Sequence, residues 1–173
     1  MHYSFSLPSL RTSIFLLGFG LSFFLPQQVA YGFRPFDADP MSRVALGGFD
    51  PVAYLETGKA VLGAPIFFVE WGGVFWRFAT KANQRKFEAE PEKFLPEVGG
   101  YCATSLAEDK TVRCDPTEFV VHEGRLFVFG NEAAKAEWLK DPEKYIQEAE
   151  AAYQQRLAEN PDSAGEIEST ERG

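Results

Sequence analysis

Few residues of this chain have side chains that could hold a soft metal ion. Beyond residue 32 the sequence contains two cysteines, Cys102 and Cys114, one histidine, His122, and one methionine, Met41. A zinc or copper(I) site generally needs three or four such ligands at one place. A metal site would therefore have to combine Cys102, Cys114 and His122. The simpler interpretation of His122 is a strand residue that faces solvent or covers the edge of the core.

The two cysteines leave three interpretations open. They lie 12 positions apart, so a Cys102–Cys114 disulfide would close a short loop and stabilise the fold by up to about 3 kcal/mol in an oxidising compartment. They could instead be a buried thiol and a bystander. The third interpretation is a redox pair, for which Arg113 is a basic neighbour of Cys114. The chain has no Cys-x-x-Cys spacing, and Cys102 has no evident basic neighbour.

Two glycine-rich stretches carry further polar groups. Asp50 and Tyr54 flank Pro51 after one Gly-Gly pair, and Tyr101 and Cys102 follow another. Loops on a rigid scaffold often carry binding groups, so Asp50, Tyr54, Tyr101 and Cys102 are expected to frame a shared pocket. Asp50→Ala and Cys102→Ser would then abolish binding and leave the fold nearly intact. The alternative is that Asp50 caps a turn and the tyrosines fill a junction between two parts of the fold.

An internal repeat indicates how these stretches are positioned. Residues 73–97 align with residues 124–148 without a gap at an offset of 51, and upstream the offset becomes 52, which matches residues 47–49 to 99–101. The matches include turn and core positions, so we interpret the pattern as a duplication with copies over about 47–98 and 99–149.

Each copy has the same predicted succession of elements. Two β-rich runs around a tight glycine turn predict a hairpin, and Thr80 or Asn131 then stands at a helix N-cap. Pro91 and Pro142 end one helix and begin the next. The predicted strands cover residues 66–71, 74–79, 119–122 and 125–130, and the predicted helices cover 81–89, 132–140 and 143–157.

The predicted fold class is therefore α+β, with two tandem units, each a β-hairpin followed by short helices, packed as one compact domain with a C-terminal helix. We expect this domain to span residues 46–157. Residues 33–45 are interpreted as an extended leader, and residues 158–173 as a disordered acidic tail.

Residues 1–32 have the pattern of a signal peptide. Arg11 precedes an apolar run over residues 12–25, and Ala30 and Gly32 stand at the −3 and −1 positions of a cleavage site after Gly32. This predicts a periplasmic or secreted protein, with an N-terminal membrane anchor as the alternative. No later segment is apolar enough to span a bilayer, so no membrane span is expected after signal cleavage.

The motifs GGFDPVAY (47–54), FWRFAT (75–80), PEKF (91–94) and GGYCA (99–103) resemble the exported branch of the YHS-domain family, over about residues 46–152. Other YHS domains are associated with heavy-metal proteins, including copper-pump appendages, and carry a cysteine after Asp-Pro-Val and a Cys-x3-Cys at a helix start. Here Ala53, Ala79 and Asn83 stand at those positions. The resemblance therefore implies the fold but not metal binding of that kind, and it leaves the cofactor unknown.

The net charge and the absence of common catalytic motifs exclude several classes of function. The formal net charge of −8 argues against nucleic acid as a partner, because phosphates are bound by lysines and arginines. No phosphate loop is present, and the single histidine beyond residue 32 argues against a Ser/His/Asp triad. We predict a non-catalytic extracytoplasmic binding module of the YHS type for a small molecule or a metal species. The alternatives are a thiol redox protein that uses Cys102, and a protein-interaction accessory with a Cys102–Cys114 disulfide and an exposed aromatic patch near Trp71.

Overall fold

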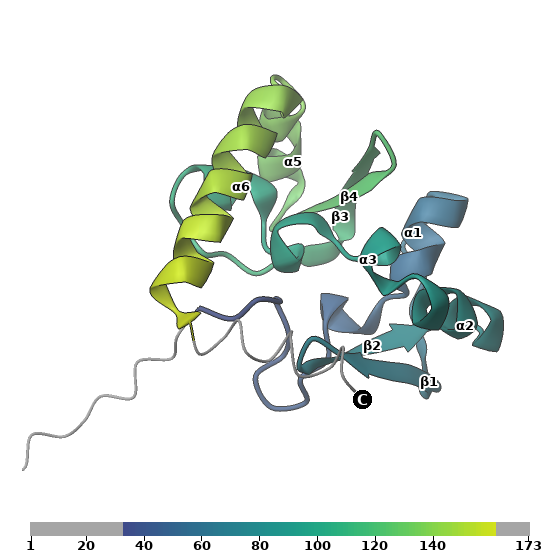
Figure 1. Ribbon diagram of the computed structural model, residues 1–173. Coiled ribbons are helices and arrows are strands. Elements are labelled where there is room, and N and C mark those ends of the chain that lie inside the picture. The colour runs from purple at the N-terminus through teal and green to yellow at the C-terminus, as the bar shows by residue number, and fades with distance from the viewer. Residues whose placement is uncertain (1–32, 162–173) are drawn as a thin grey trace, which may run out of the picture. The chain divides into compact units, whose positions relative to one another are not determined.

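The computed structural model describes residues 33–161. The predicted signal peptide (1–32) and most of the predicted acidic tail (162–173) lie outside the described residues. All the described elements belong to one unit of the chain, Tyr31–Gly173, which contains short helices and two small antiparallel sheets (Figure 1). The predicted α+β class is confirmed. Between residues 33 and 161, no helix is long and apolar enough to cross a membrane.

The same succession of elements occurs twice along the chain. The first copy consists of η1 (Leu46–Gly48), α1 (Pro51–Thr57), β1 (Ala64–Trp71), β2 (Val74–Phe78), α2 (Lys81–Ala89) and α3 (Pro91–Phe94). The second copy consists of η2 (Glu97–Gly100), α4 (Ala103–Ala107), β3 (Asp115–His122), β4 (Arg125–Phe129), α5 (Glu132–Trp138) and α6 (Pro142–Glu159).

The two hairpins share an irregularity as well as a topology. β1 pairs with β2, and β3 pairs with β4, both antiparallel. The register shifts between Ala64 and Phe68 in β1, and between Asp115 and Phe119 in β3. A proline follows the first residue of each strand, and proline has no N–H to give to a strand partner. The bulge therefore recurs at the same place in each copy for the same local reason.

Side-chain caps start the helices. Thr80 Oγ1 accepts the N–H of Asn83 at 3.1 Å at the start of α2, and Asn131 Oδ1 accepts the N–H of Ala134 at 2.9 Å at the start of α5. The glycine-rich stretches around residues 50 and 102 predict loops, whereas the structure has two further helices there, α1 and α4. The signal for α1 was present, because Asp50 at the N-cap and Pro51 at the first helical position are typical of a helix start.

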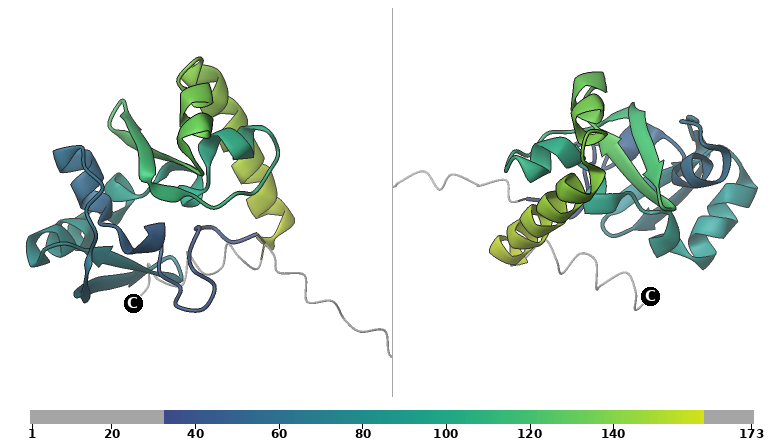
Figure 2. Two further views of the ribbon diagram at one scale, coloured as in Figure 1. Left: turned by 180° about the vertical axis from the view of Figure 1, so that it is seen from behind. Right: turned by 90° about the horizontal axis from the view of Figure 1, so that it is seen from above.

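The core consists of two clusters, one centred on each copy. The first contains, among others, Leu46, Val52, Tyr54, Trp76, Phe78, Phe87 and Phe94. The second contains Tyr101, Cys102, Leu106, Phe127, Phe129, Trp138 and Tyr145, with Ala149 of α6. α6 packs against α4 and lies on the side of the unit opposite α2 (Figures 1 and 2).

Residues 33–45 are part of the domain and not a separate leader. Phe36 is buried against Trp71 and Trp76, and the N–H of Ala45 donates to the carbonyl of Phe75 in β2. We call residues 33–40 the N-terminal strap, because they cross from the first copy to the second. The strap lies so close to Gly99 that a Cβ there would be 2.0 Å from the carbonyl oxygen of Pro35. Only glycine fits this position, where φ is +67°.

Candidate functional site

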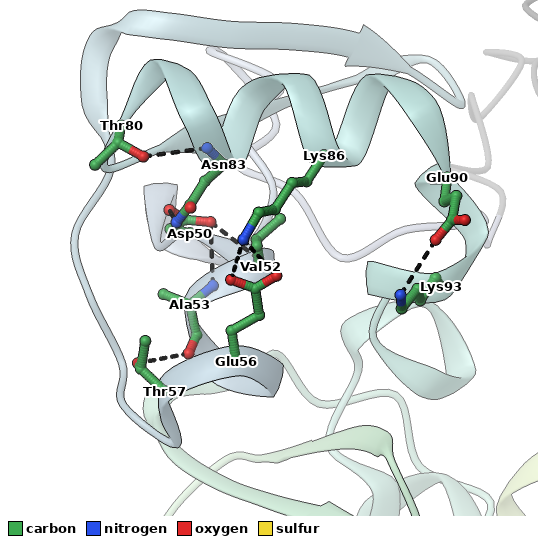
Figure 3. Close-up of polar contacts among 10 residues, drawn as sticks. All are labelled: Asp50, Val52, Ala53, Glu56, Thr57, Thr80, Asn83, Lys86, Glu90 and Lys93. Atoms are coloured by element: carbon green, nitrogen blue, oxygen red, sulfur yellow. Dashed lines mark hydrogen bonds and ion pairs between the residues drawn. The ribbon is translucent and has the colours of Figure 1, made fainter.

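Asp50 is the most heavily bonded of the predicted site residues (Figure 3). Its side chain is completely buried, at 0% exposure. Oδ1 accepts the N–H groups of Val52 at 2.9 Å and Ala53 at 3.3 Å. Oδ2 accepts the N–H of Ala79 at 2.8 Å and the side-chain amide of Asn83 at 2.7 Å. Four donors use the acceptor capacity of the carboxylate, so it joins α1, the end of β2 and α2 and has no free face for a ligand.

The three positions where the YHS resemblance implies cysteines in metal-associated members all contact this carboxylate. Ala53 and Ala79 give it their backbone N–H groups, and Asn83 gives it a side-chain N–H. The same two helices are also joined at the surface by the ion pair of Lys86 with Glu56 (Figure 3).

The other three residues of the expected pocket are also buried. Tyr54 lies on α1, and its hydroxyl donates to the carbonyl of Pro116 at 2.7 Å. Its pKa is raised, chiefly by burial, then by the charge of nearby acidic groups. The hydroxyl of Tyr101 donates to the carbonyl of Arg34 at 3.0 Å. Asp50 and Tyr54 belong to the first copy, whereas Tyr101 and Cys102 belong to the second cluster. These four residues therefore do not form one pocket, and the geometry favours the alternative in which they cap a helix and fill the core.

Both cysteines are free thiols in the structure. Cys102 is fully buried in the second cluster, where its sulfur accepts the hydroxyl of Ser105 at 3.2 Å. Cys114 instead packs against the first cluster. The disulfide is not formed, because the two side chains pack into different clusters. Burial, and then the neighbouring charge of Asp37, raise the pKa of the Cys114 thiol well above its ordinary value, which disfavours a reactive thiolate.

The structure does not bring the expected metal ligands together. His122 ends β3, where its ring meets Trp138 edge-on at 5.5 Å and its Nε2 lies 3.9 Å from Glu143. Cys102 and Cys114 are held in the two separate clusters. Over the described residues, no group of three His, Cys, Asp or Glu side chains is arranged to hold a metal ion. The set Cys102, Cys114 and His122 is therefore not a ligand set in this fold.

Three arginines from distant parts of the chain line a cavity of about 430 Å³. We call this cavity the arginine pocket. Arg34 comes from the N-terminal strap, Arg113 from the segment before β3, and Arg156 from the last turn of α6. The remaining lining residues are Phe33, Asp37, Pro40, Tyr101 and Thr111. Of the four residues first expected to bind a ligand, only Tyr101 lines this cavity.

The strap positions Arg113 through Asp37. Asp37 is buried, with its N–H donating to the carbonyl of Gly99 at 2.8 Å. Its Oδ1 accepts Nε of Arg113 at 2.9 Å, and its Oδ2 accepts the N–H of Cys114 at 3.0 Å. Burial acts to lower the pKa of Arg113, but the hydrogen bond and charge of Asp37 outweigh it and the pKa is raised. The two Nη groups of Arg113 have no partner among residues 33–161 and remain available to a ligand.

The other two guanidinium groups differ in how they are held. Arg156 donates from Nη2 to Asp109 at 2.7 Å and from Nη1 to Thr111, and its Nε is buried without a hydrogen-bond partner in the described part of the chain. The Arg34 side chain makes no ion pair or hydrogen bond with residues 33–161. Among residues 33–161, Arg113 is thus bonded through Nε alone, Arg156 is bonded through both Nη atoms, and the Arg34 side chain has no bonded partner.

This arrangement suits an anion. A guanidinium group presents a planar fork of N–H donors that matches a carboxylate or a phosphate. Three such groups gather here although the whole chain carries a net charge of −8. The sequence indicates Arg113 only as a basic neighbour of Cys114, and it gives no signal for Arg34 or Arg156. No local pattern connects positions 34, 113 and 156, because only the folded strap and α6 bring them to one place.

A larger cavity, of about 630 Å³, has less specific chemistry. It is lined by Trp71 and by the consecutive residues 88–93 where α2 ends and α3 begins. Its charged groups are three glutamates and Lys93, and Lys93 already pairs with Glu90 at 3.2 Å. Since nearly all of this lining comes from one exposed stretch of chain, it is a surface groove and not a built site.

Comparison of the chain with known protein families, with curated proteins and with solved structures found no match in any of the three.

Proposed function

We propose that this protein is an extracytoplasmic, non-catalytic binding module of the YHS type that holds a small anionic molecule in the arginine pocket. The observation that carries the proposal is the convergence of Arg34, Arg113 and Arg156 on one cavity, with Arg34 unpaired among the described residues. An unpaired guanidinium in a protein with excess acidic residues is unusual, because nearby carboxylates ordinarily pair with it. An anionic ligand would supply the missing partner.

The dimensions of the pocket favour a small molecule. A volume of about 430 Å³ lies within the range of about 300–1,000 Å³ found for small-molecule sites. The offset-stacked rings of Phe33 and Tyr101, 4.9 Å apart, add an apolar wall. The chemical class is therefore a compact molecule with one or two carboxylate or phosphate groups and some apolar surface.

The family and the cellular location in this proposal rest on sequence motifs and not on the arginine pocket. The motifs at 47–54 and 99–103 support the YHS type. The pattern of residues 1–32 supports export, either to the periplasm or out of the cell. Neither is needed for the pocket to bind an anion, so the binding experiment tests the pocket alone.

The test is calorimetric titration of the protein covering residues 33–173 with inorganic sulfate, inorganic phosphate and citrate at low ionic strength. Arg34→Gln removes the unpaired guanidinium and leaves the Arg34 carbonyl, which Tyr101 uses, in place. We expect this variant to bind the best of the three anions about tenfold more weakly, the effect of one charged hydrogen-bonding group.

The matched control is Arg85→Gln, which removes the same charge from the exposed face of α2 outside the pocket. It should change the affinity by less than about twofold, since exposed distant charges are screened. Absence of binding for all three anions, or equal losses in the two variants, would show that the arginine pocket is not a specific anion site.

A second candidate function rests on a separate observation. Leu62, Ile66 and Phe68, at or near β1, are 64%, 77% and 51% exposed. In the second copy the residue that corresponds to Phe68 is Phe119, and it is covered by Tyr54 with ring centroids 4.8 Å apart. An exposed apolar face with a covered counterpart favours a protein-interaction accessory. Trp71 itself packs against Phe36, so it does not add to this exposed face.

The redox alternative has no such support. A thiol enzyme needs an accessible thiolate, whereas Cys102 is fully buried and burial raises the pKa of Cys114.

A further inference from the structure

Phe33 is contacted on several sides although it directly follows the predicted signal peptide. Its ring stacks on Tyr101 at 4.9 Å and meets Tyr153 edge-on at 5.7 Å. The guanidinium of Arg156 lies over the same ring at 5.8 Å. Its backbone nitrogen donates to Oδ1 of Asn160 at 3.3 Å. The first described residue is therefore a fixed part of the arginine-pocket wall.

The partner of the Phe33 nitrogen is the C-terminal cap of the longest helix. α6 runs over Pro142–Glu159, and the N–H of Asn160 donates to the carbonyl of Leu157. The C-terminal end of a helix carries a partial negative charge of about half an electron, because its last carbonyl dipoles are unpaired. A positive charge on the Phe33 nitrogen would be favoured at this place.

Cleavage after Gly32 would create that charge. Hydrolysis of the Gly32–Phe33 peptide bond by a signal peptidase consumes one water molecule. It leaves a carboxylate on Gly32 and an amino group on Phe33, which binds a proton at neutral pH. The hydrogen bond to Asn160 then has an ammonium donor in place of an amide, and charge-assisted hydrogen bonds are stronger.

We infer that removal of residues 1–32 makes the α-ammonium group of Phe33 a fourth cationic group of the arginine pocket, held by Asn160 at the end of α6. The inference rests on the proposed function and extends it, because it couples anion binding to processing. The exported protein would bind the anion more tightly than its precursor.

The titratable and charged groups that face the Phe33 nitrogen or the pocket come from α6, from the strap and from the residues around α4. The pKa of Tyr101 is raised to about 12, chiefly by burial, and burial also raises the pKa of Tyr153 and of Cys114. These neighbours are Arg156 and Tyr153 on α6, Arg34 and Asp37 on the strap, Tyr101 before α4, and Asp109, Arg113 and Cys114 between α4 and β3. Between pH 6.5 and 9.5 an α-amino group on Phe33 would change its charge, since free α-amino groups titrate near pH 8.

The experiment compares two proteins that share every arginine. One begins at Phe33, and its matched control retains residues 29–32, which moves the α-amino group up to about 14 Å away. Sulfate is the probe, because its charge stays constant from pH 6.5 to 9.5. At pH 6.5 and low ionic strength the protein that begins at Phe33 should bind sulfate about threefold more tightly, as expected for one added charge beside a dianion. At pH 9.5, where the amine is neutral, the two affinities should become equal.

Each other outcome is decisive. Equal affinities at pH 6.5 would overturn the inference and leave the arginine pocket intact. An advantage that persists at pH 9.5 would mean that the four extra residues merely obstruct the pocket, which also overturns it. Absence of sulfate binding by both proteins, together with phosphate and citrate, would instead overturn the proposed function. Intact-mass measurement of the exported protein completes the test, because a mature chain that does not begin at Phe33 contradicts the inference.

Discussion

The two copies of the repeat solve the same structural problem with different chemistry. Asp50 and Cys102 are equivalent positions, each at the N-cap of the first helix of its copy. Asp50 accepts four N–H donors from α1, the end of β2 and α2. Among residues 33–161, Cys102 makes no side-chain cap bond, and its sulfur accepts the Ser105 hydroxyl alone. In the first copy a buried carboxylate is the joint between the hairpin and two helices.

In the second copy this joint is mostly apolar. Gly130 and Ala134 stand where the first copy has Ala79 and Asn83. A Cβ on Gly130 would lie 3.7 Å from the sulfur of Cys102, which is ordinary packing contact. The hydroxyl of Thr104 donates to the carbonyl of Ala134 at 2.7 Å and ties α4 to α5. The difference shows that a residue whose sequence context suggests ligand binding can instead connect secondary-structure elements, through either polar or apolar contacts. Removing the polar connection at Asp50 should lower the free energy of unfolding more than removing the apolar one, because it leaves several N–H donors without partners.

The largest expected effect follows from that contrast. Asp50→Ala should lower the free energy of unfolding by about 4 kcal/mol, since it leaves buried N–H groups and the Asn83 amide without an acceptor. Cys102→Ala should lower it by about 1–2 kcal/mol, for a lost sulfur and a small cavity. Urea unfolding of the two variants measures both. Asp50→Asn keeps one acceptor oxygen and should fall between wild type and Asp50→Ala.

A stable Asp50→Ala protein that loses only ligand binding would break this comparison. It would return Asp50 to the role of a binding residue, as the sequence alone suggested.

The glycines of η1 and η2 sharpen the comparison at a second pair of positions. Gly99 and Gly47 both have positive φ, but a Cβ on Gly99 would meet the Pro35 carbonyl at 2.0 Å, whereas one on Gly47 would meet only the Pro116 ring at 3.0 Å. We expect Gly99→Ala to cost about 3 kcal/mol and Gly47→Ala about 1–2 kcal/mol in unfolding free energy. Gly99→Ala should also speed hydrogen exchange in the strap. Similar losses of unfolding free energy in the two variants, with unchanged hydrogen exchange in the strap, would show that Gly99 does not position the strap.

Alkaline pH should lower the stability of the fold through Cys114, which packs against the first cluster. Burial, then the charge of Asp37, raise the folded-state pKa of this thiol. A raised thiol pKa means that the unfolded chain releases its proton first, so stability is constant below the unfolded pKa of about 8.5 and falls as pH rises above it. Thermal melts should therefore show a decline in Tm between pH 8 and 9.5 that is smaller in Cys114→Ala. An identical decline in both proteins would assign it to other groups.

The smallest effect concerns a feature in which the copies agree. Thr80 and Asn131 cap α2 and α5 in the same way, because each side-chain oxygen accepts the backbone N–H of the residue three positions later. Thr80→Ala and Asn131→Ala should each cost about 1 kcal/mol in unfolding free energy, and the double variant should show the sum, because the sites share no partner. Clearly unequal costs would mean that one copy supports its helix by other contacts.

The sequence by itself determined the local parts of this fold. The hairpins, the caps at Thr80 and Asn131 and the helices begun by Pro91 and Pro142 depend on residues within a few positions of one another. Their turn and capping preferences act before any long-range contact forms, so they are readable from the chain. α1 was readable too, from Asp50 and Pro51, although the glycines beside it favour a loop.

Only the tertiary structure decided which polar groups are free. The second carboxylate oxygen of Asp50 is occupied by Ala79 and Asn83, which lie 29 and 33 positions away in the sequence and come close only in the folded chain. The two cysteines remain apart because they pack into different clusters. The arginine pocket exists because Asp37 binds Arg113 across 76 positions and α6 returns to the strap. Burial and the matching of distant donors with acceptors depend on how the elements pack, and no spacing along the chain encodes that.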